Sequence, residues 1–125
     1  MGKHVEYISL NKPSRHIIGS GFAGDVECTY QQLVGLFDEP TIKTDQYKTS
    51  AEWHIEVRHD GKFKGVVAIY DYKQHDNYTG DGTETKDITS WHLGAKDTWL
   101  AQSLAAFITH PKMQQFRECS VEHNS

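Results

Sequence analysis

Apolar and polar residues alternate most regularly between residues 51 and 58 of this chain. The apolar members are Ala51, Trp53, Ile55 and Val57, and the polar members are Glu52, His54, Glu56 and Arg58. A period of two places one face on a core and the other in water, so it predicts a strand of a half-covered sheet. Asp60 and Gly61 follow as a hairpin-turn signal. The more continuously apolar residues 63–72 predict a return strand covered on both faces, at least in part.

Two other segments repeat apolar residues at the spacing of a helix. The first covers residues 30–37; it follows a capping-box pair, Thr29 and Gln32, and stops before a proline. The second covers residues 98–108, and Asp97 or the threonine after it can cap its start. Both segments are predicted to be short amphipathic helices.

Glycines punctuate the chain at two further places. Gly19, Gly21 and Gly24 match the G-x-G-x-x-G pattern of dinucleotide-binding folds. Two acidic residues follow them at once, which opposes phosphate, and the expected parallel βαβ unit is missing, so we interpret them as turn glycines. A third strand is predicted at residues 88–93, and Gly94 is expected to end it.

These elements predict an α+β fold. Residues 1–125 are expected to form one domain, near the commonest domain size. Short connections between the strands favour an antiparallel sheet of three to five strands. A short helix in the N-terminal half and a C-terminal helix are expected to pack on one of its faces.

Composition and charge limit which partners and which cellular compartment are expected. The formal net charge is −4 and no run of Lys or Arg occurs, which argues against duplex nucleic acid. No apolar run resembles a signal peptide or a membrane span, so we expect no membrane association. The two cysteines lie far apart in the chain, which favours free thiols and the cytoplasm.

A Trp-His pair occurs twice, at Trp53–His54 and at Trp91–His92. Residue parity predicts that both indoles face the core and both imidazoles face the opposite way, toward water. The imidazoles would share a face if both strands flank the strand at residues 63–72. They are then ordinary surface histidines, ligand contacts or two ligands of a divalent metal. No metal-binding spacing or nucleophile motif accompanies them, so no catalytic residue, metal or cofactor is expected and the chain is interpreted as a non-enzyme.

Four short motifs resemble a family of small tailed-phage accessory proteins. They are F-x-E-P at residues 37–40, E-W-x-I at 52–55, I-Y-D-Y-K at 69–73 and W-H-x-G at 91–94. The resemblance covers residues 29–94, roughly half of the chain. Related sequences often carry a second glycine after the last motif where this chain has Ala95, which puts in doubt any function that needs that backbone freedom.

The resemblance implies a viral accessory protein that acts in the host cytoplasm against a host system. Some phage accessory proteins of this size sequester nucleotide immune signals, including the ADP-ribose-derived signals of Thoeris defence. By this analogy we expect a non-enzymatic anti-defence protein that binds and sequesters a nucleotide-derived signal. One alternative is an inhibitor that binds a host defence protein through the acidic loop at 73–87 and an exposed sheet edge. Another is a metal-dependent hydrolase centred on His54 and His92.

A protein that traps a nucleotide needs aromatic faces for the base and donors for the phosphates. The residues expected to supply them are His54, Arg58, Tyr70, Tyr72, Lys73, His92 and Arg117. A small domain rarely encloses a nucleotide alone, so a homo-oligomer is expected. Trp99 and Phe116, at the C-terminal helix and beyond it, are the candidate assembly surface.

Overall fold

The computed structural model describes residues 5–43, 51–71, 88–110 and 118–121. The strands are β1 (Val5–Ser9), β2 (Gly21–Glu27), β3 (Ile42–Lys43), β4 (Ala51–His59), β5 (Lys62–Tyr70), β6 (Ser90–Ala95) and β7 (Glu118–Val121). The helices are the 3₁₀ turn η1 (Arg15–Ile17), α1 (Tyr30–Phe37) and α3 (Thr98–Thr109). Within the described ranges, no helix has the length and apolar character of a membrane span.

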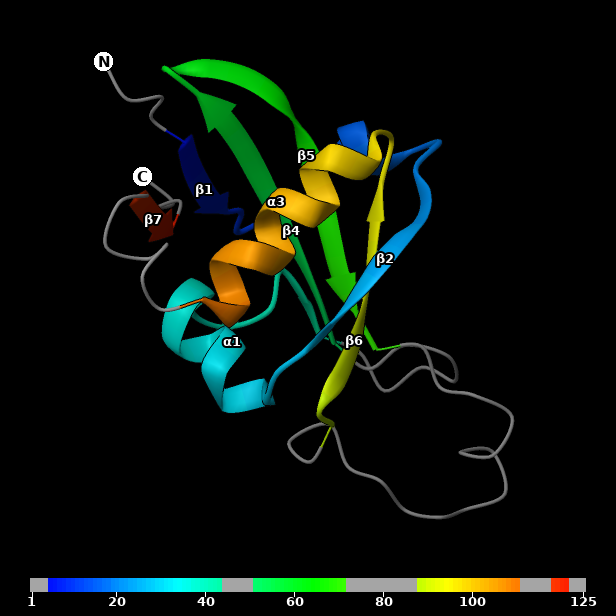
Figure 1. The fold of residues 1–125 in the computed structure, drawn as a ribbon, viewed down its shortest axis with the longest axis vertical. Coiled ribbons are helices and arrows are strands. Elements are labelled where there is room, and N and C mark those ends of the chain that lie inside the picture. Colours follow the sequence, from blue (N-terminus) through cyan, green and yellow to red (C-terminus); the bar gives the residue numbers. More distant parts are fainter. Residues whose placement is uncertain (1–4, 44–50, 72–87, 111–117, 122–125) are drawn as a thin grey trace.

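The strands form one sheet in the order β2-β6-β5-β4-β1-β7, with β3 beside β4. The five strands from β2 to β1 pair antiparallel, and β7 adds a parallel strand next to β1. Helix α3 lies across one face of this sheet, with α1 near its C-terminal end (Figure 1). The predicted α+β fold, with an antiparallel sheet and two helices, is confirmed.

The two indoles lie at the centre of the core between sheet and helices. Trp53 and Trp91 are fully buried and meet edge to face, with ring centroids 5.4 Å apart. Their Nε1 atoms donate to the backbone oxygens of Asp38 at 2.9 Å and Cys28 at 3.1 Å, so burial leaves neither donor unsatisfied. The prediction that both tryptophans face the core is confirmed.

Helix α1 begins and ends where its sequence signals predict. The Thr29 side chain accepts from the Gln32 backbone N–H, and the Gln32 side chain accepts from the Thr29 backbone N–H. This reciprocal pair satisfies two amides that a helix start otherwise leaves free. Leu33 and Phe37 then point into the core.

A connector, residues 10–20, crosses the sheet on the face opposite the helices; we call it the strap. It must cross because β1 and β2 lie on opposite sides of β4, β5 and β6. Its 3₁₀ turn lies against β5. Val66 and Ala68 are buried on the strap side of β5, and Val67 and Ile69 on the helix side. The expectation that this strand is covered on both faces is therefore confirmed.

The glycine predictions were wrong in part. Gly94 lies inside β6, and Gly21 and Gly24 lie inside β2; only Gly19, with φ 86°, occupies a turn. The reason at Gly94 is close packing between strands. A Cβ there would lie 3.4 Å from the Tyr70 ring and 3.5 Å from the Gly21 oxygen. Glycine at this position allows close approach without ending the strand.

Candidate functional site

A cavity of about 280 Å³ opens on the strap face of the sheet, where the strap joins β2. We call it the sheet-face cavity. Its lining comes from the strap, β2, β4, β5 and β6 and consists of Ile17, Ser20, Gly21, Phe22, Glu52, Ala68, Tyr70 and Gly94. Residues far apart in the sequence therefore meet here through strand pairing.

Small residues form the floor of this cavity. Ala68 of β5 and Gly94 of β6 are register partners, so two minimal side chains stand side by side on one face. The next pair along the strands, Tyr70 and His92, carries rings. A hollow results because larger groups surround a floor that has almost no side-chain volume.

Three rings gather at one side of the cavity. The His92 ring lies 5.4 Å from that of Phe22 and 5.6 Å from that of Tyr70, between centroids. His92 is half-buried, whereas Phe22 is 65% exposed. We call these three residues the aromatic cluster. The exposed ring of Phe22 can stack on a planar ligand.

An oriented carboxylate, Glu52 of β4, lies beside Tyr70 as its register partner. The Ser14 backbone N–H donates to His54 Nδ1 at 3.0 Å, so the imidazole proton lies on Nε2. His54 Nε2 then donates to Glu52 Oε2 at 2.6 Å. The Glu52 side chain is 24% exposed and lines the cavity. The imidazole therefore positions this carboxylate, whose second oxygen can accept hydrogen bonds from a ligand.

His54 corrects one expectation from the sequence. It faces away from the core as parity predicts, but it does not face water, because its exposed fraction is 1%. Two strap residues and Thr41 surround it: the Ser14 N–H donates to the imidazole, the Leu10 N–H donates to the His54 backbone oxygen at 2.9 Å, and the His54 N–H donates to Thr41 Oγ1 at 2.9 Å. His54 thus holds the strap and supports the cavity wall from behind.

The structure brings together some of the residues expected to bind a ligand. Tyr70 lines the sheet-face cavity, His92 belongs to its aromatic cluster, and His54 supports Glu52. Arg58 lies toward the other end of β4, where its Nε donates to Glu56, and it does not line this cavity. Tyr72, Lys73 and Arg117 lie outside the described residues, as do the acidic loop at 73–87 and Phe116.

Neither metal nor thiol chemistry finds support in this arrangement. No group of three or more His, Cys, Asp or Glu side chains in the described segments is placed to hold a metal ion. Both ring nitrogens of His54 already make hydrogen bonds. Burial, with the neighbouring charge of Glu27, raises the pKa of the Cys28 thiol to about 11, which keeps it protonated at neutral pH.

Sequence reasoning missed Phe22, Glu52 and the strap residues of the cavity. Phe22 stands among glycines without any periodicity, and Glu52 has the expected outward parity and belongs to the E-W-x-I motif, but neither feature predicts a cavity. Their role depends on the strap crossing the sheet, which no local pattern predicts. Comparisons with protein-family models, curated proteins and solved structures find no match to this chain.

Proposed function

We propose that this protein is a non-enzymatic binder of a nucleotide-derived small molecule, and that the sheet-face cavity receives the base and ribose of that ligand. One observation carries the proposal: two rings of the aromatic cluster, Phe22 and Tyr70, line the same cavity as the oriented carboxylate of Glu52. Rings offer stacking to any base, and a carboxylate accepts hydrogen bonds from ribose hydroxyls or an exocyclic amino group.

The size of the cavity supports a nucleoside-sized group. Its volume of about 280 Å³ lies just below the range of about 300–1,000 Å³ typical of small-molecule sites. The acidic wall at Glu52 disfavours a phosphate in this same cavity. The ligand would therefore place only its base and sugar here and extend its charged part elsewhere.

Sequestration is the biological role that we propose for this binding. A trap needs affinity but no nucleophile, and the resemblance to tailed-phage accessory proteins makes a host immune signal the candidate ligand. We further propose that a second copy of the chain helps to enclose the ligand, because Phe22 and Trp99 remain 65% and 45% exposed in the single chain. This role places the protein in the host cytoplasm.

Calorimetry with the four common ribonucleosides and ADP-ribose tests the proposal. Phe22→Ala should weaken binding of the preferred compound by about tenfold, since stacking contributes about 1–3 kcal/mol per base. Ile18→Ala is the control, because it removes another exposed, large apolar side chain that does not line the sheet-face cavity. Bound compound released by denaturation should be chemically unchanged; a converted product, or no binding to any compound, would overturn the proposal.

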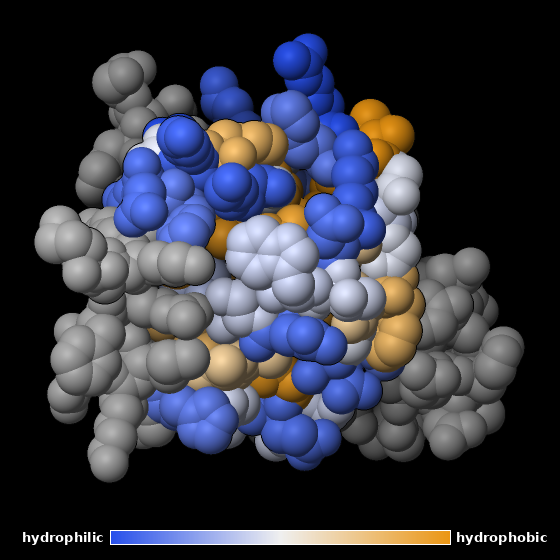
Figure 2. Space-filling view, turned by 45° about the horizontal axis from the view of Figure 1, so that its top comes forward, coloured by the Kyte–Doolittle hydropathy of each residue, from blue (hydrophilic) through white to orange (hydrophobic). Residues whose placement is uncertain are grey.

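Direct binding of a host defence protein is the second candidate function. Strand β2 ends the sheet, and an edge strand can pair with a partner strand. Figure 2 shows mainly hydrophilic residues on one side of the molecule, with apolar residues in small separate patches. Pull-down from host lysate with Ala23→Pro in β2 as the disrupted variant distinguishes this function, because proline at an edge blocks strand pairing but leaves the sheet-face cavity lining intact.

A further inference from the structure

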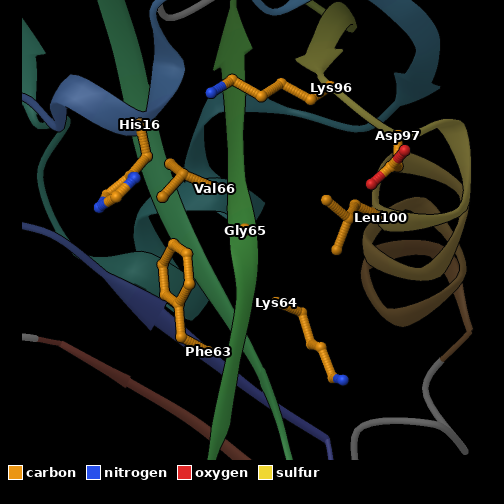
Figure 3. A pocket seen from close by; sticks show the side chains of 8 residues that line it. All are labelled: His16, Phe63, Lys64, Gly65, Val66, Lys96, Asp97 and Leu100. Carbon is orange, nitrogen blue, oxygen red and sulfur yellow. The ribbon is translucent and has the colours of Figure 1, made fainter.

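A second, smaller cavity lies beside the sheet-face cavity and has a different chemistry. Its volume is about 110 Å³, and its lining comes from the strap, β5, the β6–α3 connection and the first turn of α3. The lining residues are His16, Phe63, Lys64, Gly65, Val66, Lys96, Asp97 and Leu100. We call it the cationic cavity, after the Lys96 ammonium on its strap side (Figure 3).

The two cavities are neighbours on three elements. On β5, Ala68 lines the sheet-face cavity and Val66 lines the cationic cavity. In the same way, Gly94 in β6 lines the sheet-face cavity, and Lys96, just after β6, lines the cationic cavity. Two residues along a strand span about 6.6 Å. In the strap, His16 lines the cationic cavity and the adjacent Ile17 lines the sheet-face cavity. One ligand of nucleotide length can therefore reach from one cavity to the other.

The charges in the cationic cavity are not evenly placed. Figure 3 shows the Lys96 side chain reaching across β5 toward the side of His16 and Val66, while Asp97 lies beside Leu100. The Lys64 ammonium points away from this group (Figure 3). Within the described segments, no carboxylate forms a salt bridge with Lys96. The strap side of the cavity therefore offers the ammonium of Lys96 and the ring of His16.

The backbone of β5 adds hydrogen-bonding groups to the cationic cavity. The Asp71 N–H donates to the Ala51 backbone oxygen on β4. The backbone N–H and C=O groups of successive strand residues point to alternate sides, so those of Val66, five residues earlier, point toward β6. The β5–β6 register ends at Ala68 and Gly94, because the chain turns away at Lys96 to begin α3. Val66 can thus present one backbone donor and one acceptor to a ligand in the cationic cavity.

We propose that the cationic cavity holds the phosphate group of the ligand whose base and ribose occupy the sheet-face cavity, with Lys96 as the principal contact. A phosphate is compact enough for about 110 Å³ and requires one or two well-placed cations. This arrangement also separates the phosphate from Glu52, which lines only the other cavity. The inference rests on the proposed function, and it names the second half of the same site.

Calorimetry with the four ribonucleosides, their 5′-diphosphates and inorganic phosphate tests this assignment. The 5′-diphosphate of the preferred nucleoside should bind at least about tenfold more tightly than the nucleoside itself. Lys96→Gln should remove that gain and leave nucleoside affinity unchanged. Lys12→Gln is the control: it makes the same charge change at an exposed strap residue that lines neither cavity. Thermal unfolding checks that both variants fold.

The outcomes separate the two proposals. If a nucleoside binds but its diphosphate gains nothing, or if Lys96→Gln and Lys12→Gln lower the diphosphate affinity equally, the phosphate assignment is wrong and the proposed function stands. If inorganic phosphate binds at Lys96 while no nucleoside or diphosphate binds to the protein, a shared ligand is excluded and both proposals fail. Loss of diphosphate binding in both Phe22→Ala and Lys96→Gln, but not in Lys12→Gln, supports one continuous site.

Discussion

Gly65 shows how a single missing side chain determines the distance between a strand and a helix. A Cβ at Gly65 would lie 2.7 Å from Leu100 Cδ1, and the backbone there has φ +155°, which favours glycine. Leu100 is buried in the first turn of α3. We expect Gly65→Ala to lower the free energy of unfolding by about 1–3 kcal/mol in urea denaturation, because overpacking and backbone strain both act.

Gly35→Ala provides the control for this substitution. Gly35 lies in α1, and an added Cβ would meet nothing within 4 Å. Alanine is the better helix former, so the free energy of unfolding should rise by about 0.5–1 kcal/mol. Equal losses in the two variants would mean that the contact with Leu100 is not the cause.

His54 is the second residue whose replacement should lower stability more than its size suggests. His54→Leu leaves the Ser14 N–H and the Glu52 carboxylate without this imidazole, and an unsatisfied buried group costs about 1–3 kcal/mol. We expect that loss in urea denaturation, together with faster hydrogen exchange at the Ser14 amide. His110→Leu, at an exposed helix end, should change neither. Unaltered exchange at Ser14 in His54→Leu would contradict the role of His54 in holding the strap.

Helices α1 and α3 begin with different caps, which allows a comparison between elements. Thr29 accepts a hydrogen bond from the first turn of α1, whereas the Asp97 side chain makes no capping bond in α3. Thr29→Ala should therefore lower the free energy of unfolding by about 1 kcal/mol in urea denaturation. Asp97→Ala should cost much less, and a larger loss there than at Thr29 would show that the capping contacts are misassigned.

Elements with strong local signals were predictable from the sequence, and elements defined by distant partners were not. Helix α1 has a capping box and a following proline, and β4 has an uninterrupted period of two. Strand β2 has neither, because three of its first four residues are glycine or alanine. Its place beside β6 depends on a strap that crosses the sheet. Parity correctly placed His54 and His92 on one face, but for the same reason the cavity on that face was not predictable.

The buried thiol of Cys28 can report on global unfolding of the molecule. Cys28 belongs to the main hydrophobic cluster, and burial, then the charge of Glu27, raises its pKa from the ordinary 9.0 to about 11. Only the thiolate reacts with iodoacetamide, so alkylation of the native protein at pH 8 should be slow. Peptide mapping, which separates Cys28 from Cys119, should show its rate rising with urea in step with unfolding, and rising sooner in Gly65→Ala.

The same raised pKa links stability to pH for the molecule as a whole. Above pH 9 the unfolded chain loses the thiol proton while the folded chain keeps it until about pH 11, so ionisation favours the unfolded state over this interval. The free energy of unfolding should therefore be unaffected by Cys28 below pH 9 and should fall between pH 9 and 11. Cys28→Ala removes this contribution, and tyrosine and lysine ionisation is common to both proteins. If the free energy of unfolding falls in parallel for the two proteins between pH 9 and 11, the thiol is exposed enough to ionise in the folded chain. The core around α1 would then be more open than its packing indicates.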